Sequence, residues 1–243
     1  MASDPAEEPR HGTAPGVHEA VLEMMEKSKK GRVLDAGAGE GALTKRLLDM
    51  GFDVEACDLD PDRFKVSSIN CRNVDLNEDL PYESKSFDYV ISIETIEHLH
   101  DPWHLISECG RILRKDGWLI LTTPNIMSIT SRLRFFLFGE FSYFRHIELW
   151  REPEDTIQKL DKHINPVPFT ELEYVLSKNG LLLEEIAISK HMPKATSSPV
   201  LLISALAYPF VKAVVEKRFG KESPLSSYEL LRGVILVTKA RKK

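Results

Sequence analysis

Apolar segments of strand length alternate with segments of helical spacing through the first half of the chain. Strand-like runs occupy residues 32–37, 52–60, 72–77, 86–93 and 118–125, and helical spacing occupies residues 17–31, 41–51 and 102–117. Strands separated by helices are joined by right-handed crossovers, which gives a parallel sheet covered on both faces. Residues 168–180 then have helical spacing, with Thr170 as a candidate N-cap, and two more strands are predicted at residues 181–189 and 233–240. The sequence therefore predicts an α/β fold.

The composition is that of a globular protein, with 243 residues of which 42% are hydrophobic and 28% charged. That length suffices for one substantial core. We expect residues 1–15, which are polar and rich in Pro and Gly, to form a flexible arm and not a signal peptide. Residues 16–243 are expected to form a single domain. Residues 126–167 are too long for a plain connection after the fifth strand and predict a cap.

The net charge and the cysteine content limit which binding partners and which cellular compartment are expected for this protein. The net charge of −5 gives no general affinity for nucleic acid. Cys57, Cys71 and Cys109 have no motif spacing, so we expect free thiols and a cytoplasmic location. The apolar run at residues 199–215 contains Pro209 and Lys212 and is short for a membrane span. It predicts a buried or surface-docked helix and leaves peripheral membrane contact open, and nothing indicates the oligomeric state.

A glycine-rich loop, VLDAGAGEGA, joins the first strand to the following helix at residues 33–42. Glycines allow close approach of a ligand, and the helix N-terminus offers unpaired N–H groups to an anion. The run contains G-x-G-x-x-A, the nicotinamide-type fingerprint. However, Asp35 lies two residues before Gly37, where its carboxylate would repel a pyrophosphate.

The same run resembles motif I, D-x-G-x-G-x-G, of class I S-adenosylmethionine-dependent methyltransferases. The resemblance is continuous from about residue 32 to residue 125, and residues 163–181 extend it. It implies a three-layer, Rossmann-like sandwich with a seven-stranded sheet, the last strand antiparallel, and a helical cap insertion at residues 126–167. The cofactor contacts that it implies are Asp35, Ala36, Gly37, Gly39, Asp58, Leu59, Asp75, Leu76, Ile93 and Glu94. Among these, Asp35 suits the methionine ammonium, Asp58 the ribose hydroxyls, and Asp75 with Leu76 the adenine.

The stretch IETIEHLH, residues 93–100, places three ionisable side chains where the fourth strand ends. Glu94 and Glu97 could begin a helix and complement its dipole. Alternatively, His98 could act as a general base oriented by Glu97 or Glu94. As a third alternative, Glu94, Glu97 and His98 lie on one face of a helix and bind a divalent metal.

The third alternative also rests on resemblance. The E-x-x-E-H word is similar to the metal-binding word of ubiquinone-biosynthesis O-methyltransferases and of small-RNA 3′-terminal 2′-O-methyltransferases. The latter add a distant histidine, for which His163 is the candidate in this sequence.

The cap segment at residues 131–150 is rich in phenylalanine and arginine. These aromatics could form the cap's own core or line an acceptor pocket. An apolar cap favours a small-molecule or amphipathic acceptor, such as a quinone precursor or a lipid-linked glycan. We therefore expect S-adenosylmethionine-dependent methyl transfer to an oxygen or nitrogen atom. The alternatives are a cofactor-binding module without turnover and a nicotinamide-dependent oxidoreductase.

Overall fold

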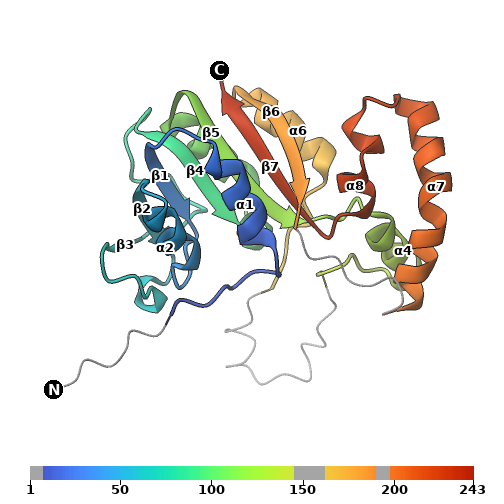
Figure 1. Ribbon diagram of the computed structural model, residues 1–243, viewed down its shortest axis with the longest axis horizontal. Coiled ribbons are helices and arrows are strands. Elements are labelled where there is room, and N and C mark those ends of the chain that lie inside the picture. Colours follow the sequence, from blue (N-terminus) through green and yellow to red (C-terminus); the bar gives the residue numbers. More distant parts are fainter. Residues whose placement is uncertain (1–7, 145–161, 190–197) are drawn as a thin grey trace.

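The computed structural model describes residues 8–144, 162–189 and 198–243. These residues contain a seven-stranded sheet of order β3-β2-β1-β4-β5-β7-β6 (Figure 1). The strands are β1 (Arg32–Ala36), β2 (Asp53–Asp58), β3 (Cys71–Asn73), β4 (Phe87–Ile93), β5 (Leu113–Pro124), β6 (Leu181–Ile188) and β7 (Ile235–Lys242). β7 is antiparallel to both of its neighbours, and β1 to β5 pair in parallel. The predicted sheet and its antiparallel last strand are confirmed.

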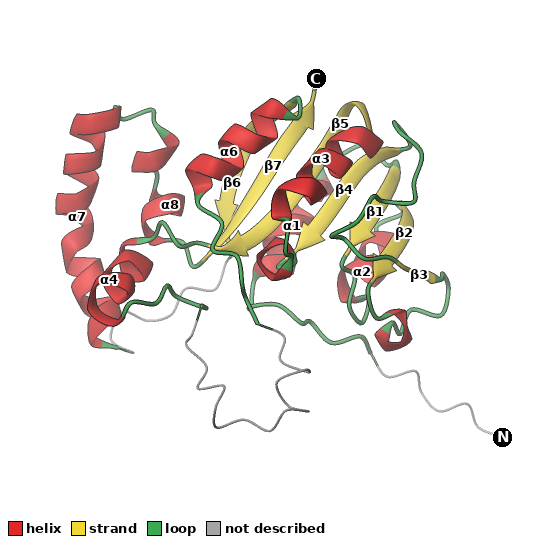
Figure 2. Ribbon diagram, turned by 180° about the vertical axis from the view of Figure 1, so that it is seen from behind, coloured by secondary structure: helices red, strands yellow, loops and turns green. Residues whose placement is uncertain are grey.

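Helices cover both faces of the sheet, because alternate strand residues point to opposite sides. On one face, α1 (Val17–Glu26) and α2 (Ala42–Asp49) pack on Val33 and Ile91 (Figure 1). On the other face, α3 (Pro102–Ile112) and α6 (Phe169–Lys178) pack on Leu34 and Val90 (Figure 2). The three layers follow directly from these alternating apolar runs.

The strand order places the functional segments together. From β1 the chain crosses over to β2 on one side, while β4 lies on the other side of β1. In such sheets the ligand crevice lies at the carboxyl ends of the strands beside this switch point. The residues that directly follow β1, β2, β3 and β4 are the glycine loop, Leu59, Val74 and Glu94.

Some predicted boundaries were wrong. Helix α3 ends at Ile112, and the next residues already belong to β5, where Asp116 has a positive φ of 63°. Helix α6 begins at Phe169 after Pro168, and the Thr170 hydroxyl bonds to Glu171 instead of capping the helix. The described part of the cap contains helix α4 (Ile129–Phe138), whereas residues 145–161 of the cap lie outside the described residues.

A second helical insertion lies between β6 and β7. It contains α7 (Pro199–Phe219) and α8 (Tyr228–Arg232), which lie beyond the edge of the sheet beside α4 (Figures 1 and 2). Asn125, just after β5, anchors α8 by donating from Nδ2 to the carbonyl oxygens of Glu229, Leu230 and Gly233, at 3.0–3.1 Å. Within the described residues, α7 is the one helix long and apolar enough to cross a membrane.

Candidate cofactor and acceptor site

The glycine loop turns sharply because three of its residues have left-handed backbone angles. Gly37, Gly39 and Gly41 have φ values of 84°, 54° and 89°. A Cβ atom on Gly37 would meet the Thr95 hydroxyl at 2.5 Å, whereas a Cβ on Gly39 would have no atom within 4 Å. The loop is therefore packed against the IETIEHLH segment at Gly37 and open at Gly39, where a ligand can approach.

Asp35 lies beneath this loop and is only 2% exposed. Burial raises its carboxyl pKa to about 6, with a hydrogen bond from the Thr44 hydroxyl opposing the rise and the charge of the nearby Asp58 adding to it. That bond joins Thr44 Oγ1 to Asp35 Oδ2 at 2.5 Å. A buried carboxyl group whose charge is disfavoured by its surroundings is suited to a cationic ligand, because the cation would stabilise the charge.

Asp58 links the end of β2 to the glycine loop. Its Oδ2 accepts a hydrogen bond from the Gly39 N–H at 2.8 Å, and its Oδ1 accepts one from the Asp60 N–H at 2.9 Å. Each carboxylate oxygen has a second lone pair, so the aligned group can still accept hydroxyl donors. The backbone thus fixes the orientation of the carboxylate, and its role in ribose binding stays a prediction.

The segment after β3 positions the predicted adenine contacts. Asp75 Oδ1 accepts bonds from the backbone N–H and the side-chain amide of Asn77, at 2.9 and 2.8 Å. Leu76 is 5% exposed and packs in the core, while Leu59 is 66% exposed beside Asp58. Leu59 therefore offers an apolar surface at this edge, and Leu76 contributes mainly to the core beneath it.

The IETIEHLH segment does not form the expected single helical face. Glu94 has a positive φ of 45°, and its N–H donates to the hydroxyl of Thr122 on β5 at 2.9 Å. Only residues Ile96–His98 then form a short 3-10 helix, η2. The left-handed residue separates Glu94 from Glu97 and His98, so the three side chains do not lie in one row.

Glu94 instead holds the N-terminal segment. Its Oε2 accepts a hydrogen bond from the Ala14 N–H at 2.8 Å, and the Arg10 N–H donates to Glu40 of the glycine loop at 2.8 Å. Glu40 also pairs with Lys65 at 2.9 Å. Residues 10–14 therefore form a strap between the glycine loop and the end of β4. Sequence reasoning missed this strap, because a backbone N–H donor leaves no trace in residue type.

Glu97 is completely buried, and neither of its carboxylate oxygens has a hydrogen-bond partner among the described residues. Burial, with a smaller contribution from the charge of Glu94, raises its pKa to about 8. The backbone N–H of Glu97, the charge of His98 and the Thr123 hydroxyl partly oppose the rise. An unsatisfied buried carboxyl group is costly and indicates a missing partner.

Two histidines complete this cluster. One ligand atom from each of Glu97, His98 and His163 lies within 4.8 Å of the others, and the two imidazole rings meet edge to face at 4.6 Å between centroids. His163 is placed there by the backbone, since the N–H groups of Ile164 and Asn165 both donate to the Glu97 carbonyl at 2.9 Å. Of the four predicted metal ligands the structure brings these three together, while Glu94 is bound to the strap.

Comparison with known families agrees with this geometry. The profile of a family described as a methyltransferase domain matches residues 10–186, well over half of the chain. The chain belongs to this methyltransferase family. The match covers the strap, the glycine loop, the IETIEHLH segment and His163, and the cofactor of the family is S-adenosyl-L-methionine. The resemblance to class I methyltransferases is confirmed.

Individual relatives support the family and the fold. A ubiquinone biosynthesis O-methyltransferase of Xanthomonas axonopodis pv. citri is 34% identical over 132 residues, which is 51% of this chain and 55% of that protein. A protein of the same name from Xanthomonas oryzae pv. oryzae is 39% identical over 103 residues, 39% of this chain and 43% of its own. The methyltransferase thus matches about half the length of these relatives. The structure of a SAM-dependent methyltransferase from Archaeoglobus fulgidus matches with a TM-score of 0.56 at 19% identity and covers 93% of each chain.

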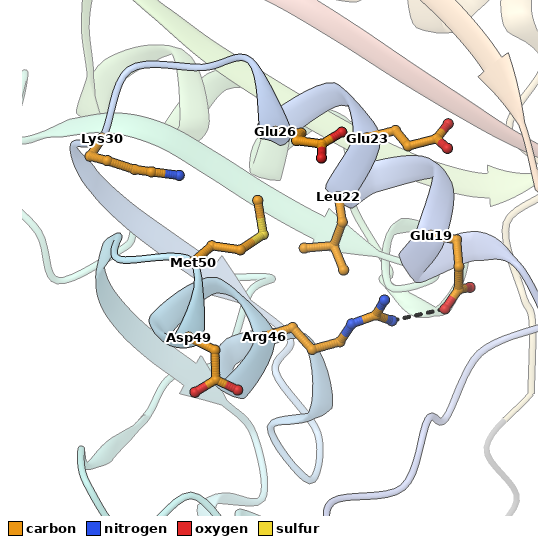
Figure 3. Close-up of a pocket in the computed structure, with 8 residues that line it drawn as sticks. All are labelled: Glu19, Leu22, Glu23, Glu26, Lys30, Arg46, Asp49 and Met50. Carbon is orange, nitrogen blue, oxygen red and sulfur yellow. Dashed lines mark hydrogen bonds and ion pairs between the residues drawn. The ribbon is translucent and has the colours of Figure 1, made fainter.

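A surface hollow between α1 and α2 lies apart from the methyltransferase motifs (Figure 3). Leu22 and Met50 lie between charged side chains, and Arg46 pairs with Glu19 at 2.9 Å. The hollow is lined by Glu19, Leu22, Glu23, Glu26, Lys30, Arg46, Asp49 and Met50. None of these residues belongs to the glycine loop or to the Glu97 cluster, so we assign the site to the carboxyl ends of the strands.

Proposed function

We propose that this protein transfers the methyl group of S-adenosyl-L-methionine to a hydroxyl oxygen of a small or amphipathic acceptor. The observation that carries the proposal is the cluster of Glu97, His98 and His163. It begins three residues after Glu94, and Thr95 of the same segment packs against the glycine loop. A group that activates a hydroxyl therefore lies next to the cofactor segments. The names of the Xanthomonas relatives favour oxygen over nitrogen as the acceptor atom.

The cofactor segments have matching chemistry for each part of S-adenosyl-L-methionine, which supplies an activated methyl group on its sulfonium. Asp35 would hold the methionine ammonium, the aligned carboxylate of Asp58 would accept the ribose hydroxyls, and Asp75 would accept the adenine amino group. Methyl transfer depends mainly on proximity and alignment. The role of the glycine loop and the strap is therefore to fix the cofactor and exclude water.

The residues of the cluster fit a divalent cation. Glu97 offers two oxygens without a hydrogen-bond partner among the described residues. His98 Nδ1 lies 3.2 Å from the Lys162 carbonyl oxygen, which can only accept, so this nitrogen carries the proton and Nε2 is the basic one. A carbonyl that fixes the tautomer in this way is common behind metal-binding histidines. A cation held there would lower the pKa of an acceptor hydroxyl.

The test begins with cofactor binding and then separates the two forms of activation. Isothermal titration with S-adenosylhomocysteine should show binding, and Asp58→Ala should weaken it about tenfold, the value of a charged hydrogen bond. Transfer of a labelled methyl group to phenols and catechols should stop with chelator and return with Mg²⁺, Mn²⁺ or Zn²⁺. If methyl transfer continues in the presence of chelator but is lost in the His98→Ala variant, the activating group is His98 Nε2 acting as a general base and not a cation. Binding of NADH in preference to S-adenosylhomocysteine would refute the proposal.

The acceptor is proposed to be amphipathic because of the residues beyond β5. Phe135, Phe136 and Phe138 of α4 are 49–84% exposed, so they do not form a closed core of the cap among the described residues. Helix α4 begins only five residues after the end of β5. These side chains are suited to a quinone precursor or a lipid-linked acceptor. Free Cys57, Cys71 and Cys109 support a cytoplasmic location, which we include in the proposal.

A further inference from the structure

Helix α7 is far more exposed than its composition would suggest. Its most apolar stretch is long and apolar enough to cross a membrane, yet only 6% of that stretch is buried. Core helices of such composition are normally buried on all sides. Here α7 lies at the outer edge of the molecule, with α4 and α8 between it and the sheet (Figures 1 and 2).

One side of α7 is fixed to the rest of the protein. Ser204 is 1% exposed, and its hydroxyl accepts a hydrogen bond from the Thr130 hydroxyl of α4 at 2.8 Å. Tyr208 meets the ring of Tyr228 at the start of α8, at 5.8 Å between centroids. At the far end of α7, the Ser226 hydroxyl donates to the Gly220 carbonyl at 3.2 Å. These contacts hold α7 against α4 and α8 at Ser204 and Tyr208, which favours a helix that lies on the protein over one that spans a bilayer.

The other side is an apolar stripe. Leu202, Ile203, Leu206, Phe210 and Val214 are 45–73% exposed. With about 100° of rotation per residue, they fall within about one third of the helix circumference, on the side away from Ser204. A row of large apolar side chains left exposed in this way indicates an interaction site.

The charges of α7 are confined to its C-terminal end. Residues 199–211 contain no charged side chain, whereas residues 212–222 contain four basic and two acidic ones. Lys217 falls in line with the stripe, and Lys212 pairs with Glu216 at 3.8 Å to one side. An apolar face that ends in basic side chains matches a lipid interface, where acyl chains meet anionic headgroups. A protein groove complementary to the stripe would not require apolar and basic side chains to be separated along α7 in this way.

We propose that the stripe of α7 docks in the plane of a bilayer that contains anionic phospholipid. The stripe enters the acyl boundary, and the basic end of α7 contacts the headgroups. This docking surface does not depend on the proposed acceptor. It would nevertheless bring the carboxyl end of β5 close to an amphipathic molecule dissolved in the membrane.

The experiment is vesicle flotation with the full chain. Vesicles of phosphatidylcholine with phosphatidylglycerol should carry the protein upward, and vesicles of phosphatidylcholine alone should carry less. The double variant Leu206→Glu, Phe210→Glu should bind at least about tenfold more weakly, because two exposed apolar side chains are replaced by charges that the interface repels. The matched control is Tyr174→Glu on α6, since Tyr174 is also exposed, at 61%. It should float like the wild type.

Titration with S-adenosylhomocysteine confirms that each variant is folded, because the substitutions lie outside the cofactor segments. Absence of flotation by the wild type, or equal flotation of the double variant, would overturn the proposal. Sedimentation equilibrium without vesicles provides a further outcome. A wild-type dimer that the double variant dissociates, without vesicle binding, would assign the stripe to a second copy of this chain instead.

Discussion

The buried carboxyl of Asp35 should contribute less to stability at neutral pH than at acidic pH, and the Asp35→Asn variant should remove this loss. Burial raises the pKa of Asp35 from 3.8 to about 6. Because the folded protein holds this proton more tightly than the unfolded chain, the contribution of Asp35 to stability is most favourable below pH 4. This contribution falls as the pH rises to about 6 and then stays low. A shift of that size corresponds to about 3 kcal/mol of unfolding free energy.

The assay is urea unfolding at pH 4 and pH 7.5 for the wild type and Asp35→Asn. The difference between the two proteins should change by up to about 3 kcal/mol between these pH values, in favour of the variant at pH 7.5. Other titrating groups are common to both proteins and cancel in this comparison. Thr44→Val is the informative companion, since loss of the opposing hydrogen bond should extend the stability loss to higher pH. A pH-independent difference between wild type and Asp35→Asn would refute the reasoning.

For cofactor binding, the order of the wild type and Asp35→Asn should be the reverse of their order in stability at pH 7.5. If the ionised Asp35 meets the ammonium of the cofactor, S-adenosylhomocysteine will bind more weakly to the wild type as the pH falls below about 6. Asp35→Asn should bind it at least about tenfold more weakly at pH 7.5, the value of a charge-assisted hydrogen bond. The variant would then be the more stable protein without ligand and the weaker binder. Undiminished binding would place the ammonium elsewhere.

Three further predictions concern the same edge of the sheet. Gly37→Ala should lower both the stability of the protein and its cofactor affinity, because its Cβ would strike Thr95. Gly39→Ala should also lower cofactor affinity, but with a loss of only about 1 kcal/mol of stability from its left-handed backbone. Denaturation and cofactor titration of both variants check this, and identical stabilities of the two variants would contradict it. Glu97→Gln should abolish cation binding, measured by equilibrium dialysis with Mn²⁺, while S-adenosylhomocysteine still binds; retained Mn²⁺ would remove Glu97 from the cation site. Glu94→Ala should weaken cofactor binding about fivefold, because it releases the strap. Glu94→Gln can still accept the hydrogen bond and should bind the cofactor like the wild type. Equal cofactor affinities of the two variants would refute the role of the strap in cofactor binding.

The fold could be predicted from sequence because its signals are local and periodic. The central parallel strands β1, β2 and β4 are short, mostly apolar runs, and the glycine loop follows β1 with three closely spaced glycines of positive φ. The boundary between α3 and β5 was predicted wrongly because residues 113–117 continue the helical spacing. Their pairing with β4, seen at Phe87 and Leu113, is a tertiary contact that overrides it.

The positions of Asp35 and Asp58 at the ends of β1 and β2 could be predicted from the sequence, because each ends a short apolar run, while their roles toward the cofactor stay predictions. The site was not predictable where the chain itself makes the contact. Ala14 reaches Glu94 through a backbone N–H across 80 residues, and Thr122 orients Glu94 through a hydroxyl on the neighbouring strand. Neither contact produces a motif, because almost any residue could occupy position 14 and still donate.

The E-x-x-E-H word illustrates how backbone geometry divides a motif between two tasks. On a regular helix Glu94, Glu97 and His98 would share one face and compete for one ligand. The left-handed angle at Glu94 turns its carboxylate toward the strap, while η2 directs Glu97 and His98 toward His163. The two carboxylates remain close enough for the charge of Glu94 to raise the pKa of Glu97. The proposed function therefore predicts that a ligand which neutralises the charge of Glu94 would favour ionisation of Glu97, so that the strap and the Glu97 cluster would be electrostatically coupled.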